Sequence, residues 1–323
     1  MLEVNTLLET IETDLSSTNG EAMKTTGYSL SPLINVAVGS VINQLVFGFR
    51  FIKESHNHFY AMNKVIDAHN RGLGHSITSV VLTLPWLRHF PLFSYYFDQF
   101  DIRLGQLYQY FDEQIRSTIE RRKKEAQSNF VRDEEDTYFV DAFVKEIEQR
   151  KTLDQGQEDQ YFNIKSLRGL CVDLFIAGQE TSSNTLNFLV LYMMVFPEVQ
   201  TKLQEELDRV IGDNEDGSKR ICLADKSKLP YTNAVINETQ RFCNLLPINL
   251  IHRTTKDVDC GGYRIAKGTK IVPMISSVLY DEKIFTEPQK FMPERFIENG
   301  QLKKCEELIP FRLANGSVWG ITS

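Results

Sequence analysis

The chain has 323 residues, 42% hydrophobic and 24% charged, ordinary values for a globular protein that holds one large domain or two smaller ones. Its net charge of −7, from 36 basic and 43 acidic side chains, gives no basic field and argues against a nucleic-acid partner. The five cysteines lack zinc-finger spacing and fit a reducing compartment better than a disulfide scaffold: Cys171, Cys222, Cys243, Cys260 and Cys305.

The N-terminal part of the chain carries helical patterns. Residues 2–15 predict an amphipathic helix, and because a domain seldom begins inside an uncapped helix, we expect the true start to lie upstream. A second helix is predicted over 32–49. Polar residues interrupt the apolar stretch 33–51, so it predicts a buried helix rather than a membrane span. A third helix over 57–69 is expected to be closed by Gly72 and Gly74.

Residues 80–97 are rich in aromatic side chains and are broken by Pro85 and Pro91, which predicts a loop with short helical turns. Core packing is the favoured interpretation of these side chains, and a membrane-touching surface is the alternative. A long helix is predicted over 102–125, and its basic end, 121–124, is interpreted as solvated. The acidic run 133–136 is expected to cap a helix over 138–149, followed by a linker at 153–160.

Residues 163–196 form the longest apolar helical pattern, which is apolar nearly all round and is expected to run through the middle of the protein. Helices follow over 198–211 and 231–242, and segments 261–265 and 267–272 predict a small hairpin. The predicted fold class is therefore mainly α, as one domain over residues 1–323 with a small β-hairpin region.

Three locally costly residues interrupt the long apolar helix. Gly178 costs about 1 kcal/mol in a helix interior. Glu180 needs a partner if it is buried, and the Thr181 hydroxyl can bond back to a carbonyl and bend the helix. A functional kink that admits a small ligand and relays protons is one interpretation. A glycine for close helix packing, with a partnered acid, is the other.

Two further patterns involve arginine. Glu238 and Arg241 share a helical face, so they form either a surface pair worth a few tenths of a kcal/mol or a buried clamp. In the sequence 293–296, Arg295 follows a proline in an ordered loop and can reach a buried carboxylate with its planar fork.

In this order, the three patterns resemble the cytochrome P450 family. Residues 177–182 match its A/G-G-x-D/E-T-T/S helix, Glu238 and Arg241 its E-x-x-R clamp, and 293–296 its P-E/D-R-F loop. Segments 139–143, 229–236 and 262–269 also resemble the animal microsomal members. The resemblance implies a mainly α cytochrome P450 fold fragment. A generic helical scaffold, the alternative, predicts that the three clamp residues lie far apart.

The resemblance implies site roles. Ala177 and Gly178 would leave room for dioxygen over a haem, and Thr181 and Glu180 would bond the oxygen and deliver protons. The other implied contacts are His252 and Phe311 to the haem, Leu246, Ile248 and Asn249 to the substrate, and Arg295 to the Glu238–Arg241 clamp.

The resemblance also implies haem b as the cofactor and monooxygenation of a small apolar substrate: a xenobiotic, a fatty acid or a steroid. Electrons would come from NADPH through NADPH–cytochrome P450 reductase. The full-length family is anchored in the endoplasmic reticulum membrane. Here the anchor is expected to be missing, which would leave the chain in the cytoplasm.

The sequence departs from the family where the iron ligand belongs. In the family's F-x-x-G-x-R-x-C-x-G, Phe311 and Gly320 match, but Ala314, Gly316 and Val318 replace the glycine, arginine and cysteine. Valine cannot ligate iron, and the thiolate is what favours cleavage of dioxygen. We therefore expect no metal ligand at Val318 and no stable haem. A catalytically dead pseudogene or mis-spliced product is the alternative function.

The tail can be decoded in another reading frame. The codons CGA-TTG-GCA-AAC-GGC-AGT-GTG-TGG-GGN can encode residues 312–320. Read from their third base, they give Ile-Gly-Lys-Arg-Gln-Cys-Val-Gly, with the family's glycine, arginine and cysteine in place. We expect sequencing of the transcript to show one lost base or a misplaced splice junction near Phe311. An in-frame message with unrelated codons would contradict this hypothesis.

Overall fold

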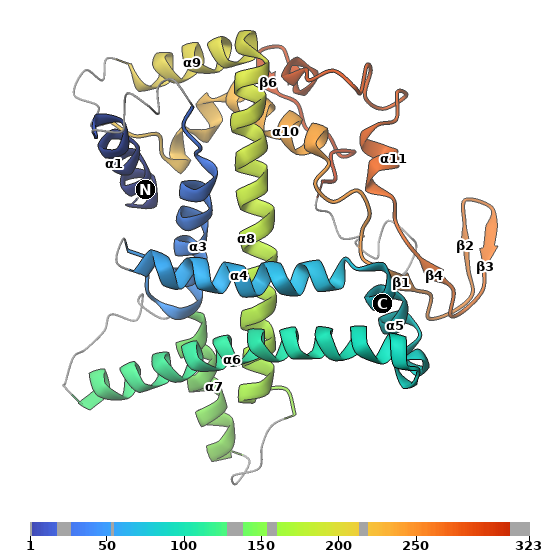
Figure 1. The fold of residues 1–323 in the computed structure, drawn as a ribbon. Coiled ribbons are helices and arrows are strands. Elements are labelled where there is room, and N and C mark those ends of the chain that lie inside the picture. Colours follow the sequence, from blue (N-terminus) through green and yellow to red (C-terminus); the bar gives the residue numbers. More distant parts are fainter. Residues whose placement is uncertain are drawn as a thin grey trace. The chain divides into compact units, whose positions relative to one another are not determined.

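A computed structural model describes residues 2–17, 27–52, 55–127, 138–153, 160–212 and 219–310. The chain forms two compact units, Met1–Ser183 and Asn184–Ser323, whose boundary falls inside one long helix (Figure 1). The predicted mainly α class is confirmed, while a single domain over the whole chain stays a prediction. No helix in the described ranges is long and apolar enough to cross a membrane. Phe311, Val318 and the acidic run 133–136 lie outside the described residues.

Unit 1 is helical throughout its described parts, and α4 and α6 lie side by side in it (Figure 1). The helix predicted over 57–69 continues to Leu73, because its last turn absorbs Gly72 and ends at Gly74. The elements are α1 (Leu2–Ser16), α3 (Ser31–Phe47), α4 (His56–Leu73), α5 (Ser76–Thr83), the 3-10 helix η2 (Pro85–His89), α6 (Pro91–Gln127), α7 (Phe139–Leu153) and α8 (Ile164–Val195), which continues into unit 2.

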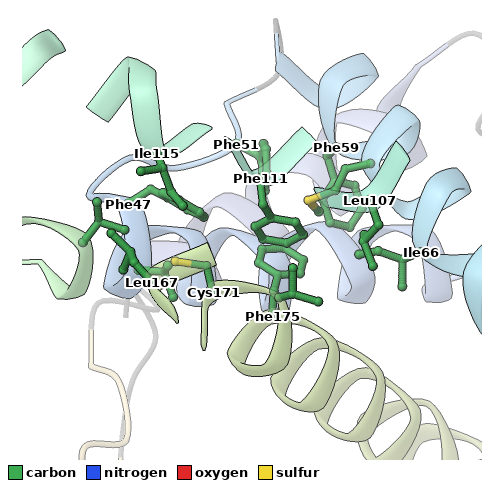
Figure 2. Packing of buried hydrophobic residues seen from close by; sticks show 14 of the residues in the cluster. Phe47, Phe51, Phe59, Ile66, Leu107, Phe111, Ile115, Leu167, Cys171 and Phe175 are labelled. Atoms are coloured by element: carbon green, nitrogen blue, oxygen red, sulfur yellow. The ribbon is translucent and has the colours of Figure 1, made fainter. Parts of the chain in front are cut away.

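The core of unit 1 is an aromatic and aliphatic cluster drawn from α3, α4, α6, α7 and α8 (Figure 2). The ring of Phe111 lies at its centre, 6.2 Å from the ring of Phe47 and 5.9 Å from that of Phe175. Phe51 and Phe59 extend the cluster at 5.1 Å. Because these rings come from segments far apart in sequence, their burial holds the helices of the unit together.

The prediction for residues 80–97 was wrong in two respects. Helix α6 begins at Pro91, not near residue 102, since a proline in the first turn lacks only an N–H that would have no helical partner. Core packing does not hold either, because Trp86 is 58%, Phe90 51% and Leu92 60% exposed. Of residues 80–97 only Val81, which belongs to α5, is buried.

The basic end of α6 is also less solvated than expected. Arg121 is half-buried, and its Nη2 donates to the carbonyl oxygen of Phe47 at 2.6 Å. Arg122 donates from Nη1 to the carbonyl oxygen of Asp141 at 3.1 Å. The two guanidinium groups therefore stabilise the C-terminus of α3 and join α6 to α7.

Unit 2 contains the end of α8 and a series of short elements. An aromatic cluster lies between α8, α10 and the loop at residue 291, where the rings of Phe196 and Phe291 stack at 5.0 Å and Tyr192 contacts both. The elements are α9 (Pro197–Ile211), η4 (Leu223–Lys228), α10 (Pro230–Cys243), β1 (His252–Arg253), β2 (Val258–Cys260), β3 (Tyr263–Ile265), β4 (Lys270–Ile271), α11 (Ile275–Leu279), η5 (Pro293–Phe296), β5 (Ile297–Glu298) and β6 (Gln301–Leu302).

The predicted hairpin exists with a different pairing. Strand β3 pairs antiparallel with β2 across Gly261 and Gly262, whose φ angles of 57° and 82° are those of the tight turn that two glycines allow. Strand β4 pairs instead with β1, with His252 opposite Ile271. The predicted segments 261–265 and 267–272 therefore belong to two separate two-stranded ladders, and β5–β6 form a third.

Candidate functional site

Helix α10 positions the first group of predicted site residues. Its N-terminus is fixed by the buried carboxylate of Glu206, which accepts hydrogen bonds from the backbone N–H groups of Tyr231 at 2.9 Å and Thr232 at 2.7 Å. The Glu206 carboxylate from α9 thus accepts from amides at the start of α10 that have no partner within the helix. Its negative charge also interacts favourably with the positive end of the α10 dipole. Sequence reasoning missed Glu206, because no local pattern links it to a helix that starts 24 residues later.

Glu238 and Arg241 form a fully buried two-point ion pair. Nε of Arg241 donates to Oε2 of Glu238 at 2.8 Å, and Nη2 donates to Oε1 at 2.8 Å. Nε of Arg295 lies 3.2 Å from Oε2 of Glu238, and its side chain is 7% exposed. The three residues lie in contact, as the family resemblance implies and a generic helical scaffold does not.

The remaining polar atoms of the clamp are bound to backbone. The N–H of Met292 donates to Oε1 of Glu238 at 2.8 Å. Arg241 donates from Nη1 to the carbonyl oxygen of Leu279 at 2.9 Å, and Arg295 from Nη1 to that of Thr286 at 2.7 Å. The Nη2 groups of both arginines reach the carbonyl oxygen of Lys290, at 3.3 and 3.2 Å. This partnering is what a buried carboxylate between two guanidinium groups requires.

The motif on α8 has both local features that its sequence allows. The Thr181 hydroxyl donates to the carbonyl oxygen of Ala177 at 2.6 Å, which is the back-bond that bends helices. A Cβ at Gly178 would lie 3.0 Å from Cδ1 of Ile42, so the missing side chain also serves close packing against α3. Both interpretations of this glycine therefore remain open.

Gln179 is a functional-site neighbour that the sequence analysis did not single out. Its side chain is buried, and Nε2 donates to the carbonyl oxygen of Asn35 at 2.9 Å and to the hydroxyl of Ser183 at 3.1 Å. It thereby connects α8 to α3. The available signal was a polar pair, four residues apart, inside an apolar helix.

The other side of α8 in unit 1 is open. Leu170 and Leu174 are more than 40% exposed, Ala177 is exposed and Thr181 is half-buried, and their spacing of four, three and four residues makes one helical stripe. The expectation that α8 is buried all round was therefore wrong for the described chain. The stripe places the small side chain of Ala177 beside the Thr181 hydroxyl.

The remaining predicted contacts lie in unit 2. Leu246 is 40% and Ile248 52% exposed, and Asn249 is tied down by its N–H, which donates to the carbonyl oxygen of Pro273 at 2.9 Å. His252 is exposed on β1. Residues 246–251 are thus irregular backbone that leads into β1 and leaves apolar side chains uncovered, and the haem and substrate roles of this segment stay predictions.

The fold is mainly helical, and its long helix α8 carries Ala177 and Thr181 on an open stripe. Later in the chain, two guanidinium groups hold a buried carboxylate. These features are the ones that define the class of haem monooxygenases that the sequence resembles. A family model described as Cytochrome P450 matches residues 3–312. The chain belongs to the cytochrome P450 family. The matched range ends one residue after Phe311, so the segment that departs from the family pattern lies beyond it.

Curated relatives give the same family. The chain is 33% identical over 297 residues to Cytochrome P450 2D26 of Mus musculus, covering 91% of this chain and 55% of the relative. It is 34% identical over 304 residues to Cytochrome P450 2C55 of Rattus norvegicus, covering 93% and 58%. It is 34% identical to Cytochrome P450 2C15 of Oryctolagus cuniculus, covering 90% and 72%. The chain thus spans little more than half the length of the mouse and rat relatives.

No described cysteine occupies the family's iron-ligand position, which holds Val318 in this sequence. Burial raises the pKa of Cys171, deep in the unit 1 core, to about 12, and it raises the pKa of the Cys243 and Cys305 thiols as well. At neutral pH these three cysteines therefore favour the neutral thiol. Cys305 is half-buried against the cluster of Phe285 and Phe296. Within the described ranges, no group of three metal-ligating side chains occurs.

Proposed function

We propose that the chain carries the oxygen-side helix and the structural clamp of a haem monooxygenase, but not the cysteine that holds the iron. The reaction class is insertion of one oxygen atom of dioxygen into an apolar substrate, a xenobiotic, fatty acid or steroid, while the other leaves as water. NADPH supplies the electrons through NADPH–cytochrome P450 reductase, at the endoplasmic reticulum membrane. The contact of Glu238 with Arg241 and Arg295 carries the proposal, because it joins two separate motifs in one buried network.

In this proposal the chain's own groups have separate tasks. The small side chain of Ala177 leaves space for a small molecule to approach the backbone of α8. The Thr181 hydroxyl, which donates to the Ala177 carbonyl oxygen, lies next to that space. Glu180 exchanges protons with solvent next to that hydroxyl. The exposed side chains of Leu246 and Ile248 favour an apolar substrate.

Val318 supports a second candidate: a catalytically dead, haem-free product of a pseudogene or of mis-splicing. The two candidates share the fold and differ in whether the tail of the encoded protein contains a cysteine. The shifted reading of residues 312–320 favours a parental enzyme with the complete loop.

We expect the purified full chain, mixed with haem, reduced and exposed to carbon monoxide, to show no absorbance band at the thiolate position. The physical reason is that valine offers no electron pair to iron. A chain whose residues 313–320 are replaced by the shifted reading should gain the band, and the same tail with serine in place of its cysteine should lose it. A thiolate band from the unchanged chain would contradict the missing-ligand proposal.

A further inference from the structure

A groove in unit 1 combines several cationic groups that play no part in the clamp or in the α8 stripe. It has a volume of about 620 Å³ and lies between α4, α5 and α6, the two side-by-side helices and the short helix that follows α4 in Figure 1. Its cationic and acidic lining residues are Lys64, Asp67, Arg71 and Arg103.

The spacing of these residues shows that the groove is built by two helical faces. Lys64, Asp67 and Arg71 follow one another at intervals of three and four residues along α4. Gln99 and Arg103, four residues apart, form the facing stripe of α6. Both helices therefore turn polar atoms toward the same space.

The charge of the groove is unbalanced. Three cations against one carboxylate give a formal excess of two positive charges, in a chain whose net charge is −7. Lys64, Arg71 and Arg103 form no ion pair and donate no hydrogen bond to any part of the chain that the structure describes. Cations gathered without a partner repel one another, and an anion in the groove removes that repulsion.

Arg103 is the least solvated of the three. It is half-buried, and its Nη1 lies 2.8 Å from the position that a Cβ would take on the buried Gly72, so the guanidinium rests where a side chain is missing. Behind it, burial and then the charge of Arg103 lower the pKa of His69, which keeps that imidazole neutral. The Arg103 guanidinium, half-buried beside the neutral His69 ring, therefore has its donors available to the groove and not to an acidic side chain of the protein.

The aromatic wall adds a further donor. The ring of His75 stacks on that of Tyr96 at 4.6 Å, and Tyr95 meets Tyr96 edge-on at 5.5 Å. Nδ1 of His75 accepts a hydrogen bond from the N–H of Ile77 at 3.3 Å, so Nε2 is the ring atom that carries a proton and can donate it.

We infer that this groove binds a phosphoryl group, carried by a small soluble molecule or by a lipid headgroup. The charge of the groove favours phosphate over carboxylate. A phosphate monoester carries about −1.5 to −2 charges at neutral pH and balances the two excess positive charges, whereas a carboxylate leaves one of them unbalanced. The guanidinium forks of Arg71 and Arg103 suit phosphoryl oxygens.

The test uses the full chain and two sources of the group. Calorimetric titration with phenyl phosphate covers the soluble source, with benzoate as the carboxylate comparison. Co-sedimentation with phosphatidylcholine vesicles, with and without phosphatidic acid, covers the lipid source. Binding in either arm supports the inference and names the source. Binding in neither arm, or benzoate bound as tightly as phenyl phosphate, overturns it.

Variants locate the binding. Arg103→Gln is expected to weaken it about tenfold, the effect of losing one charge-assisted hydrogen bond. The double variant Lys64→Gln/Arg71→Gln changes exposed side chains only and keeps the test decisive if Arg103→Gln does not fold. Lys145→Gln, which removes an exposed cation of α7 outside the groove, should bind like the unchanged chain. Unweakened binding by both groove variants overturns the inference.

Discussion

Glu238→Gln is expected to lower the free energy of unfolding by about 3–5 kcal/mol, because it leaves Arg241 buried and uncompensated. The amide keeps the size of the carboxylate, but its NH2 group must face guanidinium donors or the N–H of Met292. Domains are stable by only about 5–15 kcal/mol, so the variant should be partly unfolded at physiological temperature. Equilibrium urea unfolding, followed by circular dichroism, measures the loss.

A matched change separates buried from exposed acids. Glu306→Gln removes a carboxylate that pairs with Lys304 at the surface, where both side chains are more than 60% exposed. Exposed pairs are worth about 0–1 kcal/mol, so this variant should unfold close to the unchanged chain. Equal losses for Glu238→Gln and Glu306→Gln would show that the clamp is not buried in solution.

Arg241→Met tests whether the clamp acts as one network. It removes two donors to Glu238 but leaves Arg295 and the N–H of Met292 on the carboxylate. The loss for the double variant with Glu238→Gln should therefore be smaller than the sum of the two single losses, as for groups that share partners. Additive losses would mean that Glu238 and Arg241 do not stabilise the protein through each other.

The clamp also shows how far the sequence leads. The spacing of three places Glu238 and Arg241 on one helical face, which is local geometry and was readable from the sequence. The carbonyl partners of Arg241 lie at Leu279, the end of the short helix α11, and at Lys290 on irregular backbone, and Arg295 adds Thr286. The position of such backbone depends on the packed structure, so the spacing could not name those partners.

The helices and strands show the same difference between what the local sequence determines and what tertiary packing determines. The range of α8 was predicted within one residue at each end, because a long apolar pattern bounded by Pro197 leaves little choice. The start of α6 was missed by eleven residues, since proline both ends helices and begins them. Partners of two-residue strands such as β1 and β4 are fixed by tertiary contacts, not by alternation.

Burial was the weakest inference from composition. Trp86, Phe90 and Leu92 resemble core residues in a hydropathy pattern, yet they are exposed. Conversely, the polar side chains of Glu206 and Gln179 are buried because backbone donors and acceptors surround them. Hydropathy ranks residue types by their average tendency to be buried. Whether a given side chain is buried depends on the packing neighbours or hydrogen-bond partners that the fold provides for it.

Gly48→Ala is expected to cost about 2–5 kcal/mol, because two separate penalties act at one position. Gly48 closes α3 with a φ of 77°, a left-handed conformation that costs a residue with a Cβ about 1–2 kcal/mol. The added Cβ would also lie 2.2 Å from a ring carbon of Tyr138, and overpacking of this kind costs about 1–3 kcal/mol. Urea unfolding of the full chain measures the sum.

Gly105→Ala is the matched control, because its Cβ meets nothing within 4 Å and it lies inside α6. Alanine is the better helix former there, so this variant should gain about 0.5–1 kcal/mol. Repeating Gly48→Ala in a Tyr138→Ala background separates the penalties: relief of the clash should recover part of the loss, while the left-handed strain remains. Full recovery would contradict the left-handed turn, and no recovery would contradict the contact between Gly48 and the Tyr138 ring.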